Sequence, residues 1–152
     1  MTPRKLRERL QPVNTSASYE TLPIAAAMHA GVVTCRPETP LGNVAQMMAG
    51  HRIHSVVVWS DARAADEEGT LWGVVSDLDI AGAVARGEPG VTARIVASAP
   101  VLTIESAETI RRGAEVMVEH GVAHLVVVKR GRPVGVLSTL DLARLLADEA
   151  SA

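Results

Sequence analysis

One heptad occurs twice in the chain, and this duplication constrains the fold more than any other feature of the sequence. Residues 73–79 read Gly-Val-Val-Ser-Asp-Leu-Asp, and residues 135–141 read Gly-Val-Leu-Ser-Thr-Leu-Asp. Each copy is a short apolar run that stops at Ser and continues in a helical pattern, which is typical of a strand leading into a helix. In the first copy we therefore expect Ser76 as the N-cap and Asp79 at N3 of a capping-box variant.

The chain around the two heptads repeats as well. The second heptad places Ser138 and Asp141 in the same two roles, N-cap and N3 residue. Upstream, Thr34 and Thr103 lie in equivalent strands 69 positions apart, whereas the two heptads are 62 positions apart. The difference of seven residues falls in a hairpin turn, where a change of length leaves the fold unaltered. The sequence therefore predicts two copies of one structural unit.

The order of the sequence patterns predicts the fold class. Each unit reads as strand, helix, strand, strand, helix, because short apolar runs alternate with stretches of helical periodicity. We expect an α/β (α+β) fold of two pseudo-symmetric β-α-β-β-α units, each with a small mixed sheet. The predicted boundaries are a tail or short helix at 1–20, the first unit at 21–88, the second unit at 89–148 and a C-terminal tail at 149–152.

Charge and composition exclude several classes of partner. Fifteen basic against seventeen acidic residues give a formal charge of -2, and aromatic residues make up only 2% of the chain. Neither nucleic acid nor a membrane is therefore an expected partner. The sequence shows no stretch of membrane-spanning length and no recognisable signal peptide. Cys35 is the single cysteine, which excludes an intrachain disulfide and fits a reducing compartment, so we expect a cytoplasmic location.

The repeat resembles a known family. The order strand, helix, strand, strand, helix, twice, with Gly-x-x-Ser-x-x-Asp-apolar ending each unit, is similar to a pair of CBS domains, the Bateman module, over residues 21 to about 148. The resemblance implies two units packed sheet to sheet and a module that binds an adenosine-containing ligand, such as AMP, ADP, ATP or S-adenosylmethionine. It also implies a homodimer formed through helices, regulation of an unidentified protein partner, no catalysis and no required cofactor.

The resemblance implies the positions of the ligand-binding residues. Asp79 and Asp141 match the aspartates that hold the ribose hydroxyls in the family. Ser76 and Ser138 match a hydroxyl position near the ribose or the phosphate. The residues matching the strand entrances that flank the base are Thr34, Ile53, Ser55, Thr103, Val122 and Ala123.

Hairpin geometry brings further side chains to these helix starts. The start of the first strand of a hairpin lies beside the end of its second strand, so His54 is expected near Ser76 and His124 near Ser138. The free N–H groups and the dipole of the following helix favour an anion there, and either histidine is a candidate donor to ribose or phosphate. The same geometry places the basic turn 129–132 at the opposite end of its hairpin, away from the helix start.

Several basic residues allow two interpretations. Arg52, Arg111 and Arg112 are candidate phosphate partners, but a solvated helix face explains the last two equally well. His51 and His120 carry the same ambiguity. The histidines also form two spaced pairs, yet these fall across helix-to-strand junctions without a Cys or carboxylate at ligand spacing, so no metal site is predicted.

Three hypotheses for function remain open at this point. The leading one is a stand-alone regulatory module with an adenosyl ligand in one or both clefts. The second is an interaction scaffold with vestigial clefts, in which Asp79 and Asp141 only cap helices. The third, an enzyme or a metal-dependent sensor, is weaker because the sequence holds no nucleophile with a recognisable base and no phosphate-binding Gly-rich loop, so no catalytic residue is predicted.

Overall fold

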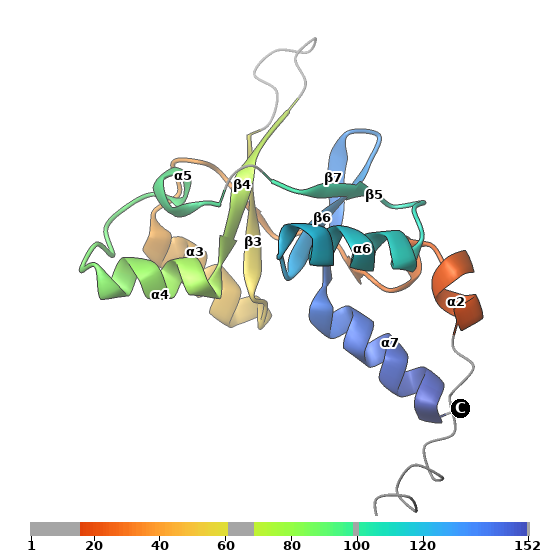
Figure 1. Cartoon of the computed structure of the whole chain (residues 1–152). Coiled ribbons are helices and arrows are strands. Elements are labelled where there is room, and N and C mark those ends of the chain that lie inside the picture. Colours follow the sequence, from red (N-terminus) through yellow and green to blue (C-terminus); the bar gives the residue numbers. More distant parts are fainter. Residues whose placement is uncertain (1–15, 61–68, 99–100, 152) are drawn as a thin grey trace, which may run out of the picture.

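The computed structural model describes residues 16–60, 69–98 and 101–151, which form two halves lying side by side (Figure 1). Residues 1–15 of the predicted N-terminal tail or short helix (1–20) lie outside the described residues, and residues 16–20 belong to helix α2 (Ser16–Thr21). Residues 61–68, in the first predicted hairpin, also lie outside the described residues. Within the described ranges, no helix combines the length and the apolar character needed to cross a bilayer.

The first half holds a three-stranded mixed sheet. The strands lie in the order β2-β3-β4, with β2 parallel to β3 and β4 antiparallel to it. Three helices pack with this sheet. The elements are β2 (Thr34–Cys35), α3 (Leu41–His51), β3 (Ser55–Ser60), β4 (Thr70–Ser76), α4 (Asp77–Ala85) and α5 (Ala93–Val96).

The second half repeats this plan with one added strand. Its sheet has the order β1-β7-β6-β5, in which only β5 runs parallel to its neighbour. Residues 149–151 continue the last helix. The elements are α2 (Ser16–Thr21), the 3-10 helix η1 (Ile24–Ala26), β1 (His29–Ala30), β5 (Thr103–Glu105), α6 (Ile110–His120), β6 (His124–Lys129), β7 (Arg132–Ser138) and α7 (Thr139–Ser151). The predicted fold class is confirmed, with mixed sheets and two β-α-β-β-α units.

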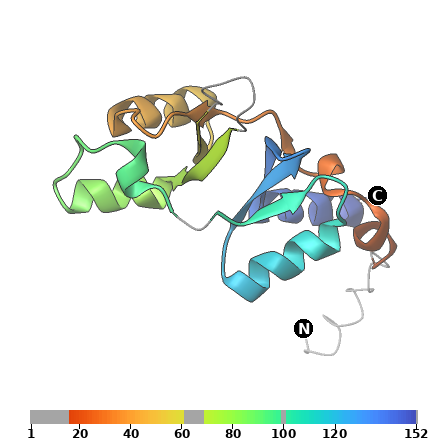
Figure 2. The ribbon, with the colours of Figure 1, turned by 90° about the horizontal axis from the view of Figure 1, so that it is seen from above.

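The two halves exchange the segments that lead into them, residues 24–30 and 93–98. In the first leading segment, β1 pairs with β7 and Ile24 is fully buried in the core of the second half (Figure 2). In the second leading segment, Ala93 is fully buried in the core of the first half and Ser98 bridges to β4. Each half is therefore completed by chain that lies next to the other half in sequence.

A third apolar cluster joins the two sheets. Its buried members are Val57 on β3 and Val126 and Val128 on β6, with half-buried Val74 and Val136 packed around them. These side chains alternate with those that face the helices, because neighbouring residues of a strand point to opposite faces of its sheet. The sheets therefore pack face to face, and all three clusters are aliphatic at their centres.

Candidate functional site

The start of α4 is a closed capping box. The Ser76 N–H and Oγ donate to Asp79 Oδ2 at 2.8 and 2.9 Å, and the Asp79 N–H donates to Ser76 Oγ at 3.3 Å. At α7 the Ser138 N–H and Oγ donate to Asp141 Oδ2 at 2.8 and 3.0 Å, and the Asp141 N–H donates back at 3.2 Å. The predicted capping roles are confirmed, and each aspartate keeps Oδ1 outside the box.

The two Oδ1 atoms have unequal partners. His29 Nδ1 lies 2.8 Å from Asp141 Oδ1, and Asp141 is only 4% exposed. Ser98 Oγ donates to Asp79 Oδ1 at 3.4 Å. His29 and Ser98 occupy equivalent places, since they are 69 positions apart on the two leading segments and each faces the strand that ends in the heptad.

Neither residue was identified from the sequence, because the contacts join segments far apart in the chain. His29 and Asp141 are 112 positions apart. The offset of 69 that relates Thr34 to Thr103 also relates His29 to Ser98. That offset was the available signal, but it does not reveal which half each leading segment joins.

Two clefts open beside these helix starts. The Asp79 cleft, of about 460 Å³, combines Ser76 and Asp79 of the first half with Val101, Leu102 and residues 121–124 of the second. In the Asp141 cleft, of about 620 Å³, the second half supplies the helix start and the first half supplies the opposite wall. Its lining includes residues 138–141 of the second half and Val32, Val33 and residues 51–55 of the first. Each cleft thus takes its helix start from one half and its apolar wall from the other.

The clefts collect most of the residues predicted to bind a ligand. The Asp79 cleft contains Ser76, Asp79, Val122, Ala123 and His124, and the Asp141 cleft contains Ile53, His54, Ser55, His124, Ser138 and Asp141. Thr34 and Thr103 line neither cleft as far as the described residues extend; both are exposed, and they pair with Val57 and Val126 in the sheets. The binding roles of all these residues stay predictions.

The hairpin registers place the two predicted histidines beside the helix starts. Ser55 lies opposite Ser76 in the β3–β4 pair, and His54 Nδ1 lies 3.0 Å from Asp77 Oδ2. His124 lies opposite Ser138 in the β6–β7 pair. These neighbour relations are confirmed, and the structure adds that each hairpin also contributes its strand start to the cleft of the opposite half.

His124 lines both clefts and is held towards its neutral form. Burial lowers the pKa of His124 from the ordinary value of 6.5. Nearby Asp77 opposes that shift, His54 adds to it, and Asp141 again opposes it. A neutral imidazole can both donate and accept a hydrogen bond, so His124 presents a polar but uncharged group between the two clefts at neutral pH.

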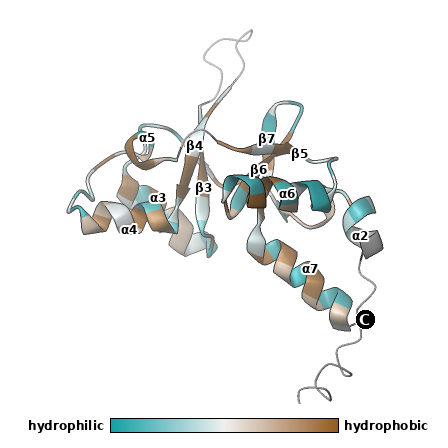
Figure 3. Ribbon diagram, viewed as in Figure 1, coloured by the Kyte–Doolittle hydropathy of each residue, from teal (hydrophilic) through white to brown (hydrophobic). Residues whose placement is uncertain are grey.

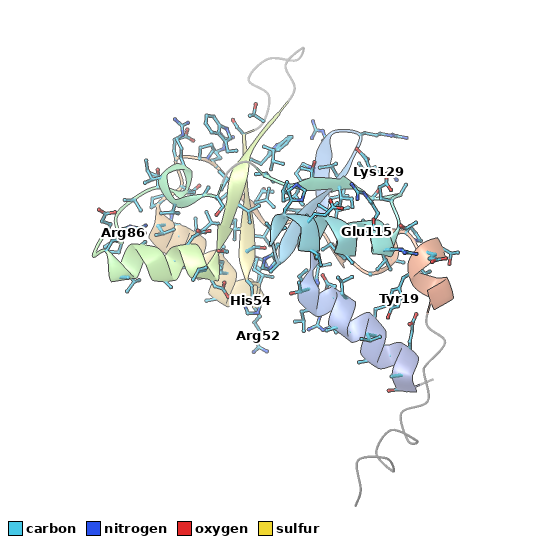
Figure 4. The ribbon with its side chains drawn as sticks, in the orientation of Figure 1. Tyr19, Arg52, His54, Arg86, Glu115 and Lys129 are labelled. Atoms are coloured by element: carbon cyan, nitrogen blue, oxygen red, sulfur yellow. The ribbon has the colours of Figure 1, made fainter. Side chains whose placement is uncertain are left out.

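The basic residues separate into two groups. Arg111 and Arg112 on α6 form ion pairs with Glu115, and Arg111 also pairs with Glu20, which identifies a solvated helix face. Arg52 lies instead in the lining of the Asp141 cleft, together with His29, His51 and Arg144. Arg144 was not singled out in the sequence. Figure 4 shows Arg52 and His54 at the same end of the molecule, with Lys129 of the basic turn at the other.

The helix starts offer an anion less than the sequence predicts. The Thr139 N–H donates to the Ala123 carbonyl at 3.0 Å, and the Asp77 N–H donates to the His54 carbonyl at 3.1 Å. The capping carboxylates of Asp79 and Asp141 already occupy the positive ends of the helix dipoles. A phosphate in either cleft would therefore depend on side-chain cations more than on the helix termini.

No metal centre is formed by the described residues, since no three His, Cys, Asp or Glu side chains in them are placed to share an ion. Cys35 is buried in the core of the first half, and burial raises the pKa of its thiol. Its environment is that of a packing residue rather than a ligand or nucleophile.

Comparison with known proteins identifies the class to which this geometry belongs. The CBS domain matches residues 24–86 and again residues 93–148. The chain therefore belongs to the CBS domain family, and its two copies form a Bateman module. A comparison with curated protein sequences found no significant match.

Solved structures of CBS domain pairs share the fold over nearly their whole length. A CBS domain protein from Pyrobaculum aerophilum complexed with AMP is 29% identical, with a TM-score of 0.71, covering 86% of this chain and 100% of that one. A CBS domain pair in complex with 5'-methylthioadenosine and S-adenosyl-L-methionine is 22% identical, with a TM-score of 0.73 and coverages of 85% and 98%. Hypoxic Response Protein I, with two coordinated zinc ions, is 27% identical, with a TM-score of 0.65 and coverages of 81% and 98%.

Proposed function

We propose that this protein is a regulatory module that binds an adenosine-containing ligand in the clefts beside Asp79 and Asp141 and transmits occupancy to a protein partner. It has no catalytic role in this proposal. The observation that carries it is the paired construction of the clefts, in which a carboxylate at a helix start faces an apolar wall from the other half. Such a site offers acceptors to a ribose diol and an apolar surface to a base.

The solved relatives support the ligand class. The protein from Pyrobaculum aerophilum, which forms a complex with AMP, is 29% identical over almost the whole module. The capping geometry is compatible with ribose binding, because Oδ1 of Asp79 has only a long contact, at 3.4 Å, with Ser98. A ligand that bridges a helix start and the opposite wall would contact both halves at once, which gives a physical route from occupancy to a change in the whole module.

A calorimetric titration with AMP, ADP, ATP, adenosine and S-adenosylmethionine tests this function. We expect at least one ligand to bind with a micromolar dissociation constant, worth about 8 kcal/mol. Asp79→Asn and Asp141→Asn are the sharpest variants, because the amide oxygen still accepts from the capping Ser while the charge and one acceptor are lost. Loss of binding in one variant, with its melting temperature nearly retained, would locate the working cleft.

A scaffold without a ligand is the second candidate, and one observation favours it. Both Asp141 oxygens already have partners within 3.0 Å, and the residue is buried. On that hypothesis no member of the panel binds, and Asp→Ala changes at the two positions lower only the stability. The same titration therefore separates the two functions.

We also infer a homodimer. Leu78 and Val84 on α4 are 78% and 67% exposed, and the residues 62 positions later, Leu140 and Leu146 on α7, are 47% and 52% exposed. Figure 3 shows hydrophobic residues along both helices. Equivalent apolar residues left exposed on equivalent helices fit a second copy that covers both. The cytoplasmic location expected from the sequence stays a prediction.

A further inference from the structure

The two clefts are built from equivalent positions but carry different charges. Residues 51–55 of the Asp141 cleft correspond to residues 120–124, of which 121–124 line the Asp79 cleft. The linings of the two clefts can therefore be compared position by position. In the described linings, arginines occur in the Asp141 cleft and not in the Asp79 cleft.

Arg52 gives the clearest contrast. It follows α3 in the left-handed conformation, with φ 53°, and its equivalent after α6 is Gly121, with φ 62°. Glycine adopts this conformation without penalty, whereas a side chain there is strained. Arg52 lines the Asp141 cleft and Gly121 lines the Asp79 cleft. The chain therefore keeps an arginine in a backbone conformation that suits glycine, at a position that faces a cavity.

Three further basic residues of the Asp141 cleft also correspond to residues without a basic side chain. Arg144 on α7 corresponds to Gly82 on α4, His54 to Ala123 and His29 to Ser98. The one equivalent pair of histidines is also split, because His51 lines the Asp141 cleft while His120 bonds to a carbonyl of its own helix at 3.0 Å.

The two arginines have no competing partner in the described part of the chain. Arg52 and Arg144 take part in no ion pair there, whereas the arginines at 86, 94, 111 and 112 are all paired with glutamates. Each cleft has two carboxylates in its described lining, Asp77 in both, with Asp79 in one and Asp141 in the other, but the described lining of the Asp79 cleft contains no Arg or Lys. The two arginines of the Asp141 cleft attract a phosphate, whereas no arginine or lysine in the described lining of the Asp79 cleft offsets its carboxylates.

We propose that the Asp141 cleft binds the phosphate of an adenine nucleotide through Arg52 and Arg144, and that the Asp79 cleft takes an adenosyl ligand without phosphate. This assignment rests on the proposed function, namely that the clefts bind adenosyl ligands. It divides the ligand classes between the clefts by charge. The arginines of the Asp141 cleft bind the phosphate, and the Asp79 cleft, whose described lining has no arginine or lysine, does not favour it.

Calorimetric titration of the full chain with AMP and with adenosine tests the proposal. AMP should bind at least ten times more tightly than adenosine, because charge-assisted bonds to phosphate add to those made by the nucleoside. Arg52→Gly and Arg144→Gly should each weaken AMP about tenfold or more and leave adenosine affinity within about twofold. Arg52→Gly removes backbone strain, so it should fold at least as well as the parent chain.

Arg130→Gly is the matched control. Arg130 has the same φ of 53° but lies in the turn between β6 and β7, at the far end from Arg52. It loses the same charge from the same backbone conformation, and AMP affinity should not change. A reciprocal variant, Gly121→Arg, should create a second AMP site that Asp79→Asn removes. Apart from the adjacent residues, no described atom lies within 4 Å of the added Cβ, and the φ of 62° imposes on it the strain that Arg52 already bears.

The outcomes separate this assignment from the proposed function. If adenosine binds but AMP binds no better, or if Arg52→Gly and Arg144→Gly leave AMP affinity unchanged, the charge assignment is wrong while adenosyl binding stands. If neither adenosine nor AMP binds the unaltered chain but another member of the panel does, the assignment fails and the proposed function stands. If no member of the panel binds, both fail.

Discussion

The carboxylates of Asp79 and Asp141 have the same cap but different second partners, and this difference has an energetic consequence. Asp141 is 4% exposed and lies 2.8 Å from His29, whereas Asp79 is partly exposed and receives a 3.4 Å bond from Ser98. A buried carboxylate that loses a partner keeps the full desolvation penalty, whereas an exposed one recovers water. His29 should therefore contribute more than Ser98 to the free energy of unfolding.

His29→Ala should lower the free energy of unfolding by about 1 kcal/mol, because it leaves Asp141 Oδ1 buried without its partner. Ser98→Ala, at the equivalent position, should change it by less than about 0.5 kcal/mol, since water replaces a weak bond. Urea denaturation of the two variants beside the parent chain measures both values. Equal losses at the two positions would show that the His29 contact contributes nothing specific.

At the residue scale, the sequence predicts what is local and misses what is not. The Ser and Asp of each capping box are three positions apart, so Ser76 and Asp79 could be paired from spacing alone. His29 and Ser98 could not, because their partners lie in segments whose packing the spacing does not determine. Arg144 was missed for the same reason, since a single arginine on a helix is usually solvated.

The exchange of leading segments is the main feature at the scale of elements, and Gly135 shows how closely it is packed. A Cβ on Gly135 would lie 2.6 Å from the His29 carbonyl oxygen and 2.6 Å from the Met28 sulfur. The backbone oxygen cannot move without separating β1 from β7. Glycine at this position of the heptad therefore permits the close approach of the exchanged strand.

Gly135→Ala should lower the free energy of unfolding by about 1–3 kcal/mol, because the added methyl group overpacks the contact with β1. Gly42→Ala is the matched change, since its Cβ meets nothing within 4 Å on helix α3, and it should raise the same free energy by about 0.5–1 kcal/mol. Thermal unfolding followed by circular dichroism compares the two. A Gly135→Ala chain as stable as its parent would contradict the packing described for β1.

Element type and order were predictable because each hairpin and helix carries its own periodicity. In any hairpin the start of the first strand lies beside the end of the second, and this rule placed His54 and His124 correctly. The strand β1 has only two residues, too few for any alternation to be read. Its pairing with β7 is set by the packing of the two halves.

At the scale of the whole molecule, the exposed apolar residues of α4 and α7 determine the expected assembly. Val84→Glu and Leu146→Glu should each convert the dimer into a monomer, because a carboxylate would be buried against the second copy. Ile95→Glu is the control, since Ile95 is 68% exposed on α5, outside these two helices. Sedimentation velocity measures the oligomeric state of each variant, and a monomeric parent chain would rule out the homodimer.

The residues that line each cleft are brought together by the packing of the whole molecule, so the sequence could predict only part of each lining. The side chains that line each cleft come from four or five separate segments, and which segments meet depends on how the two sheets pack. The repeat predicted two clefts, and most of the predicted binding residues line them, while their binding roles stay predictions. It did not predict that each cleft would draw on both units, or that Arg52 and Arg144 would line the same one.

The exchanged leading segments also determine how the chain could be divided. A cut in the connection at 86–92 would leave an N-terminal piece that carries η1 and β1, which complete the second half, and a C-terminal piece that carries α5 and Ser98, which complete the first. Two copies of the same piece lack complementary edges, whereas one of each supplies everything the intact chain has. The module is thereby suited to fragment complementation, in which the two pieces identify each other by the strand or helix that each one holds for the other.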